Sequence, residues 1–201
     1  MKPVFLIGSG PSLRALTHEE RTQLAHLPCI ATSVYVRWPD AWQPWGYVVC
    51  DFVDLGVVTQ EVDARWPTIN KFFTTVPAEF RPLVGWTWIK RRGTHKIEKG
   101  QWSNEFLSYS MAYNPLWYVV QLAARLGQNW DTFVLLGSEH TPEGYAHDPA
   151  MAHVRNLSVS RYECWMLSQM LAQRGITLLD ASGPTSTLEI PRVTLQEVLK
   201  C

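Results

Sequence analysis

The sequence predicts an α/β protein with an open, mostly parallel sheet, built as a single domain over residues 1–201. Stretches with a strand pattern alternate along the chain with stretches that have a helix pattern. Residues 47–50 and 131–137 form almost continuous apolar runs, which are typical of strands buried on both faces. The first apolar run, residues 3–7, leads directly into a glycine-rich turn.

Each expected element has a local signal. Helices are predicted after Thr17, where Glu20 completes a capping box, and from Pro115, where apolar residues recur at helical spacing. A long helix is predicted over residues 158–174, ended by Gly175, and a short one over residues 194–200. The expected strands cover residues 3–7, 29–36, 47–50, 71–75, 86–89, 131–137 and 176–181.

Composition excludes several classes of protein. The formal net charge is zero, so no overall positive field favours nucleic acid. No apolar stretch approaches the length of a membrane span, and residues 1–3 lead straight into a strand with no signal peptide. The four cysteines show no C-x-x-C spacing, and Cys29 and Cys50 fall in apolar runs where a reduced, buried thiol is expected. We therefore expect a cytoplasmic protein.

The turn at residues 8–12 (GSGPS) is the main candidate for a ligand site. Gly8 and Gly10 permit close backbone approaches, and Pro11 suits the start of a helix. A strand that opens into such a turn places backbone N–H groups at the end of a sheet, where an anion can bind. The alternative is a plain strand-to-helix turn, because the third glycine of the dinucleotide motif is missing.

Other features are less specific. Several of the ten tryptophans lie in loop-like sequence, namely Trp38, Trp42, Trp45, Trp86, Trp88 and Trp102, whereas Trp117 and Trp165 lie in helix-like segments. We expect most of them to pack in the core and two or three to contact a ligand. The basic stretch at residues 90–99 is either a solvated loop or a contact for phosphate groups.

Three segments together resemble a known group of proteins: residues 5–13 (FLIGSGPSL), the unit from Leu126 to Glu139, and residues 175–182 (GITLLDAS). Their order and spacing are similar to those of the bacterial sialyltransferases of glycosyltransferase family 42. They also resemble the related motility-accessory-factor and 6-hydroxymethylpterin pyrophosphokinase-like domains. Only the first segment is specific, and residues 38–102 match nothing in these families.

The resemblance implies a Rossmann-like nucleotide-binding fold and, as in the sialyltransferases, no required metal. The glycine turn would hold the donor nucleotide and its phosphate, which carries onto Gly8, Ser9, Gly10, Pro11 and Ser12. Donor contacts would also come from Ser33, Asp51, Asn114, Gly137, Ser138 and Tyr145. Ser33 and Asp51 are asparagines in the sialyltransferases, so the donor can differ. The family's T-S-G turn falls on Asn114 and Pro115, which is a departure from the pattern.

These observations predict a glycosyltransferase that uses a nucleotide sugar as substrate and needs no cofactor. The loop at residues 141–156 would close over the site, and a histidine in it would act as general base. His153 is the nearest match to the family's base and His147 is its rival. The acceptor is left open between a glycan and a modified nucleic-acid base, and a homo-oligomer is also left open.

Three other readings stay open. A magnesium-dependent, pyrophosphokinase-like phosphoryl transferase would use Asp51, Asp54 and Glu139. A metal site would draw its ligands from Glu139, His140, His147, Asp148 and His153, although no metal-binding motif spacing is present. The third reading is a nucleotide-binding module without catalysis.

Overall fold

The computed structural model describes residues 1–32, 34–50, 55–73, 84–88, 91–92, 106–107, 115–126, 128–139, 146, 148 and 157–200. Its strands are β1 (Pro3–Ile7), β2 (Cys29–Thr32), β3 (Gly46–Val49), β4 (Asn70–Phe73), β5 (Thr87–Trp88), β6 (Arg91–Arg92), β7 (Phe106–Leu107), β8 (Thr132–Leu136) and β9 (Thr177–Asp180). Its α-helices are α1 (His18–Ala25), α2 (Leu55–Arg65), α3 (Pro115–Arg125), α4 (Leu157–Ala172) and α5 (Leu195–Leu199), with 3₁₀ turns η1 (Pro11–Ala15) and η2 (Tyr35–Arg37).

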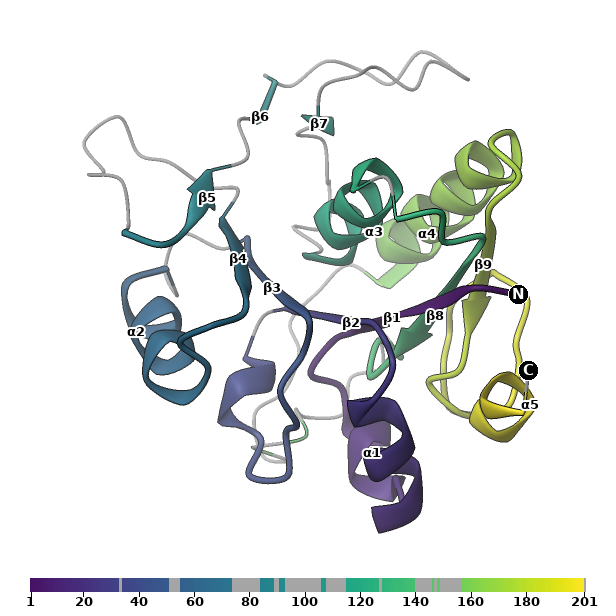
Figure 1. Ribbon diagram of the computed structural model, residues 1–201. Coiled ribbons are helices and arrows are strands. Elements are labelled where there is room, and N and C mark those ends of the chain that lie inside the picture. The colour runs from purple at the N-terminus through teal and green to yellow at the C-terminus, as the bar shows by residue number, and fades with distance from the viewer. Residues whose placement is uncertain are drawn as a thin grey trace.

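The predicted α/β fold is confirmed. Seven strands form one sheet in the order β5-β4-β3-β2-β1-β8-β9, and every pair of neighbours in it is parallel. In Figure 1, α1, α2 and α5 lie on one side of this sheet, and α3 and α4 lie on the other. β6 and β7 form a separate parallel pair. The arrangement is a Rossmann-like sheet with helices on both faces.

The strands supply two cores by simple alternation. Phe5 and Ile7 of β1 belong to the core under α1, α2 and α5, whereas Val4 and Leu6 belong to the core under α3 and α4. Because successive side chains of a strand point to opposite faces, a strand buried on both faces needs apolar residues at every position. The apolar run at residues 133–136 of β8, a strand that is buried along its whole length, has the same cause.

Local signals set the helix ends. Thr17 caps α1 by accepting a hydrogen bond from the N–H of Glu20, whose carboxylate accepts from the N–H of Thr17. The same reciprocal pair joins Thr194 and Glu197 at α5. Gly175 follows α4 with a φ of 71°, a left-handed conformation that favours glycine. The predicted caps at Thr17 and Gly175 are confirmed, and the capping box at Thr194 is a finding of the structure.

The second strand is shorter than the predicted 29–36, because the chain turns into η2 after β2. Tyr35 leaves the strand and packs against Trp38, Trp42 and Trp66, with ring centroids 5.6 to 6.1 Å apart. The phenolic oxygen of Tyr35 also accepts a hydrogen bond from the N–H of Trp42. Burial of this aromatic cluster competes with extension of the strand. The local β pattern could not predict this competition, because the cluster includes Trp66 from a distant part of the chain.

The tryptophans of the loop-like sequence are therefore mostly core residues, as expected. Trp38 and Trp42 are buried, and the indole N–H of the buried Trp86 donates to Asp63. Trp165 behaves differently from its packed neighbours on α4, because it is 44% exposed and stacks on Tyr162. The side chains of Trp88, Trp102 and Trp117 lie outside the described residues.

Cys29, Cys50 and Cys164 are buried free thiols, which confirms the prediction for the first two. Burial raises the pKa of the Cys29 thiol to about 12, so it stays protonated at neutral pH. Within the described part of the chain, no helix is both long enough and apolar enough to cross a membrane.

Arg65, the last residue of α2, holds the segment after η2. Its guanidinium donates to the carbonyl oxygens of Val36, Trp38, Pro39 and Ala41 at 2.8 to 3.0 Å. A lysine has a single ammonium on a flexible stem and cannot reproduce this fork of donors. We expect Arg65→Lys to lower the free energy of unfolding by about 2 kcal/mol, measured by urea denaturation.

Arg21→Lys is the matched control, because Arg21 makes one hydrogen bond to a backbone carbonyl, that of Leu16. Its expected cost is about 0.5 kcal/mol. Equal losses in the two variants would contradict the assigned role of Arg65.

Candidate functional site

The strand order defines where a ligand site is expected. Strands β2 to β5 follow β1 on one side, and β8 and β9 lie on its other side. The first strands are therefore added outward on one side of β1 and the last strands on its other side, so the order of strand addition reverses between β1 and β8. Parallel sheets of this kind bind ligands at the carboxyl ends of the strands beside such a reversal. Three turns follow β1, β8 and β9 there, at residues 8–12, 137–139 and 181–186.

The glycine turn packs directly on the turn after β8. The N–H of Gly8 donates to Leu136 O at 2.9 Å, and the N–H of Gly10 donates to Gly137 O at 2.7 Å. A Cβ on Gly8 would collide with Gly137 O, and a Cβ on Gly10 would collide with the Glu139 carboxylate. The two glycines are therefore required by close backbone and side-chain approaches, which is one reason that glycine is used in such turns.

Gly137, in the turn after β8, packs closely against Leu13, which follows the glycine turn. Its φ is 65°, and a Cβ there would lie 2.9 Å from Cγ of Leu13. The turns after β1 and β8 thus interlock at three glycines. Two further links join them to their surroundings: Ser9 O accepts from the N–H of Ala146 at 2.8 Å, and the Ser138 N–H donates to Ser182 Oγ at 3.1 Å.

Glu139 places a carboxyl group inside the glycine turn. Its Oε1 accepts a hydrogen bond from the backbone N–H of Ser12, at the start of η1. Its side chain is buried, and Oε2 has no hydrogen-bond partner among the residues that the structure describes. The group that accepts the Ser12 N–H in this turn is thus the protein's own carboxyl group.

Burial raises the pKa of the Glu139 carboxyl above its ordinary value, because the charged form loses its hydration. The Ser12 hydroxyl and N–H act in the opposite direction, and the nearby negative charge of Asp180 raises the pKa further. The net direction is upward. Glu139 is therefore easier to protonate than a solvated glutamate.

Glu139 also changes how a phosphate would bind to the turn. The N–H groups of Gly8, Gly10 and Ser12 already donate within the protein. A phosphate on the Ser12 N–H would replace the Glu139 carboxylate or bind beside its protonated form. The sequence analysis placed Glu139 among magnesium ligands and missed this role, although a carboxylate three residues after the end of the buried strand β8 was the available signal.

The structure brings together seven of the residues predicted to bind the donor. These are Gly8, Ser9, Gly10, Pro11 and Ser12 after β1, and Gly137 and Ser138 after β8. Their role in donor binding stays a prediction. Six other predicted residues lie outside the described part of the chain: Ser33, Asp51, Asn114, Tyr145, and the two candidate bases His147 and His153.

Most ligands of the two alternative metal sites also lie outside the described residues. No group of three or more His, Cys, Asp and Glu side chains is arranged to hold a metal ion within the described residues. Of the magnesium ligands considered above, only Glu139 lies in this part of the chain, because Asp51 and Asp54 fall outside it. His140, His147 and His153 of the second metal set also fall outside.

Comparison with known proteins supports the fold. No protein-family model and no curated protein matches the sequence. Among solved structures, the chain is similar to a MAf glycosyltransferase from Magnetospirillum magneticum AMB-1, with a TM-score of 0.61 and 13% sequence identity. The match covers 97% of this chain and 34% of that protein, so this chain spans about a third of its length. The similarity shows that this chain has a fold distantly like that of this glycosyltransferase.

Proposed function

We propose that this chain is a glycosyltransferase that moves a sugar from a nucleotide-sugar donor to an acceptor hydroxyl. The observation that carries the proposal is the interlocked glycine turn at the carboxyl end of β1, next to the reversal of strand addition in a glycosyltransferase-like sheet. Parallel α/β proteins bind nucleotides at this position.

In this proposal, the turn at residues 8–12 binds the donor phosphate, and the Glu139 carboxyl leaves the Ser12 N–H when the phosphate arrives. Backbone N–H groups and hydroxyls then stabilise the leaving phosphate without a metal. His153 or His147 removes the proton of the acceptor hydroxyl, because imidazole has a pKa near neutral pH.

Binding is tested first. Calorimetry with CMP-, UDP-, GDP- and dTDP-linked sugars, with and without magnesium, is expected to show metal-independent binding of one donor. We expect Glu139→Gln to strengthen that binding about tenfold, because one negative charge beside the phosphate is removed while an acceptor for the Ser12 N–H is kept. Weaker binding by Glu139→Gln would contradict the displacement of Glu139 by phosphate.

Turnover is tested second. Release of the free nucleotide is expected to fall by about 10²- to 10⁴-fold in the variant of the true base, either His153→Ala or His147→Ala, with donor affinity unchanged. His26→Ala is the matched control, because His26 is exposed at the end of α1. Binding of nucleoside triphosphates only with magnesium would replace the proposal by the phosphoryl-transferase reading. Failure of every nucleotide to bind would refute it.

A further inference from the structure

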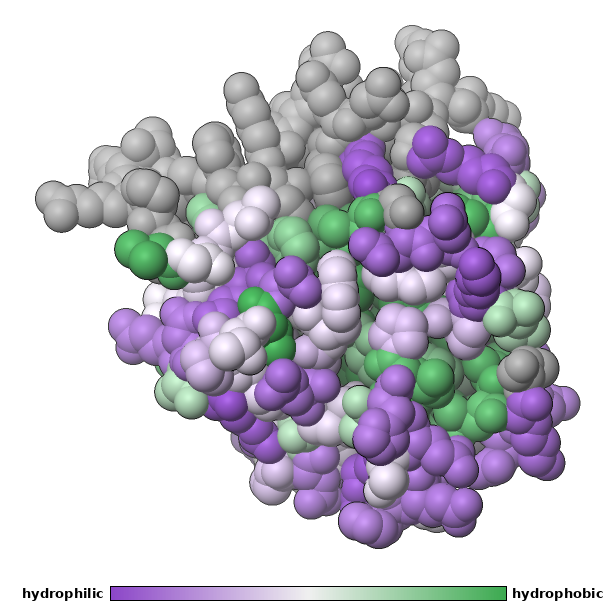
Figure 2. Space-filling view, viewed as in Figure 1, coloured by the Kyte–Doolittle hydropathy of each residue, from purple (hydrophilic) through white to green (hydrophobic). Residues whose placement is uncertain are grey.

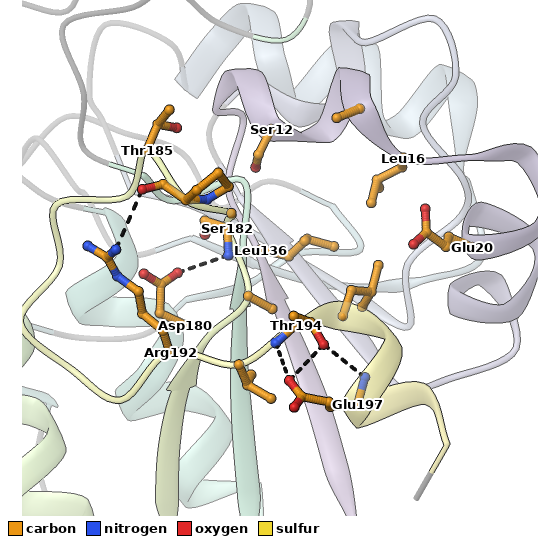
Figure 3. Close-up of a pocket in the computed structure, with 16 residues that line it drawn as sticks. Ser12, Leu16, Glu20, Leu136, Asp180, Ser182, Thr185, Arg192, Thr194 and Glu197 are labelled. Atoms are coloured by element: carbon orange, nitrogen blue, oxygen red, sulfur yellow. Dashed lines mark hydrogen bonds between the residues drawn. The ribbon is translucent and has the colours of Figure 1, made fainter.

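A cavity lies beside the glycine turn, on the face of the sheet covered by α1 and α5. Its volume is about 650 Å³. Its walls come from η1, the ends of β8 and β9, the turn after β9 and the start of α5, as Figure 3 shows. Figure 2 shows a green, apolar area among purple side chains where α1 and α5 lie in Figure 1. A hydrogen bond of 3.0 Å from Gln196 to Glu20 joins these two helices.

Asp180, at the end of β9, supplies an unsatisfied acceptor to this cavity. Its Oδ1 accepts a hydrogen bond of 2.9 Å from the N–H of Ser182, which Figure 3 shows as a dashed line. Its side chain belongs to a residue that is only 2% exposed, and Oδ2 has no partner among the described residues. A buried polar atom without a partner is rare in folded proteins and is unfavourable. The cavity is therefore suited to a ligand that donates a hydrogen bond.

Ser12, in η1, adds a second polar group to the cavity wall. Its hydroxyl oxygen is buried and interacts with the Glu139 carboxyl, whose pKa it lowers, so the oxygen keeps a lone pair that can accept a hydrogen bond from a ligand. A hydroxyl both donates and accepts, whereas the Asp180 carboxylate only accepts. A ligand that carries several hydroxyl groups satisfies both residues.

The charges around the cavity argue against an anionic ligand. Three acidic residues, Asp180, Glu20 and Glu197, line the cavity together with one basic residue, Arg192. The Arg192 guanidinium already donates to the carbonyl oxygens of Ser186 and Pro184. Hydrogen bonds from Thr194 lower the pKa of Glu197, which keeps its carboxyl group charged at neutral pH. The surplus of negative charge repels phosphates and carboxylates.

The remaining lining is largely apolar, with Leu16, Leu136, Val193 and Leu195 among its members. Small-molecule sites commonly combine such walls with a few polar groups, at volumes of about 300–1,000 Å³. A pyranose ring presents a face of C–H groups to apolar walls and hydroxyls at its edge. We propose that this cavity binds a neutral sugar, with Asp180 Oδ2 accepting from a sugar hydroxyl and Ser12 Oγ hydrogen-bonded to a neighbouring one.

The binding of a neutral sugar stands on the cavity alone. The further assignment of this sugar as the acceptor of transfer rests on the proposed function. It would place the acceptor next to the donor phosphate, since Ser12 belongs to both the cavity and the glycine turn. Ser12 is thus the residue through which the two sites meet.

The test is a titration of the ¹⁵N-labelled full chain with glucose, galactose, mannose, N-acetylglucosamine and lactose, followed by two-dimensional NMR. At least one sugar is expected to shift the amide resonances of Ser182, Gly183 and Thr194 in a saturable way. Glucuronate is expected to bind more weakly than glucose, because its carboxylate meets the negative cavity. A response to glucuronate as strong as that to the neutral sugars would overturn the proposed selectivity.

Asp180→Asn is the decisive variant, because Asn keeps an acceptor for the Ser182 N–H and turns the free acceptor into a donor. We expect it to weaken sugar binding at least about tenfold. Asp40→Asn makes the same change at an exposed carboxylate that does not line the cavity, and should bind as the parent does. Ala15→Trp adds bulk at an exposed residue of the cavity wall and should also abolish binding, even if Asp180→Asn fails to fold.

The outcomes separate the two proposals. Sugar shifts that survive both Asp180→Asn and Ala15→Trp, or no shifts with any sugar, would overturn this inference whatever the nucleotide-binding result. Sugar shifts that the two variants remove, in a chain that binds no nucleotide, would uphold the sugar site and refute the transferase.

Discussion

Gly8→Ala is expected to lower the free energy of unfolding by about 3 kcal/mol or more, because the new Cβ meets backbone that cannot rotate away. The atom in its path is Gly137 O, which lies in the interlocked turn after β8. Either β1 or β8 must shift, and the two strands pair over their whole length. Urea denaturation followed by tryptophan fluorescence measures the loss.

Gly10→Ala is expected to be costly for a different reason. The nearest obstacle is the Glu139 carboxylate, with Gly137 O behind it at 2.7 Å. A side-chain end can move, so the alanine is expected to expel Glu139 from the turn and leave the Ser12 N–H without its acceptor. Shortening Glu139 to alanine should therefore recover part of the loss in Gly10→Ala and none of the loss in Gly8→Ala. This is the coupling that a double-mutant cycle measures.

Gly56→Ala is the matched control for both glycine variants. Gly56 lies in α2, and a Cβ there would meet nothing within 4 Å. Alanine is the better helix former, so the change should be neutral or stabilising by up to about 1 kcal/mol. Equal losses at Gly8 and Gly56 would contradict the interlocking of the turns.

Glu139 is expected to make the stability of the protein fall as the pH rises. Because burial raises the pKa of this carboxyl in the folded protein, the folded state holds its proton more tightly than the unfolded chain does. The stabilisation is fully present below the ordinary glutamate pKa of about 4.5 and is lost as the pH rises through the raised value in the folded state. Glu139→Gln removes this titration while it keeps an acceptor for the Ser12 N–H, so its stability should exceed the parent's at neutral pH.

Denaturation midpoints of the parent and of Glu139→Gln, measured between acid and neutral pH, test this prediction. Glu197→Gln is the control with the opposite sign, since hydrogen bonds from Thr194 lower the pKa of Glu197. Its contribution is present above the ordinary pKa and is lost as the pH falls through the lowered one. Glu139→Ala should instead be destabilised by about 1–3 kcal/mol at every pH, because the Ser12 N–H loses its partner. A parent profile no steeper than that of Glu139→Gln would contradict the burial of a titrating carboxyl.

The sequence by itself determined the elements whose signals are local. The apolar runs of β3 and β8 predict strands buried on both faces, the run of β1 predicts a strand, and the capping box at Thr17 marks the start of α1. The alternation of these elements was enough to predict a parallel α/β sheet. Hydrophobic periodicity and capping act within a few residues, and for that reason they can be read from the chain alone.

Tertiary structure decided what depends on residues far apart in the chain. The Glu139 carboxyl enters a turn that begins more than a hundred residues earlier, and no local pattern indicates that it meets the Ser12 N–H there. Tyr35 ends β2 because it packs with Trp66 from beyond α2. Asp180 becomes an unsatisfied acceptor only because the ends of β8 and β9 close a cavity with η1. Each of these features arises from long-range burial, and the cost of burying a charge or a polar atom is set by neighbours that the sequence does not place side by side.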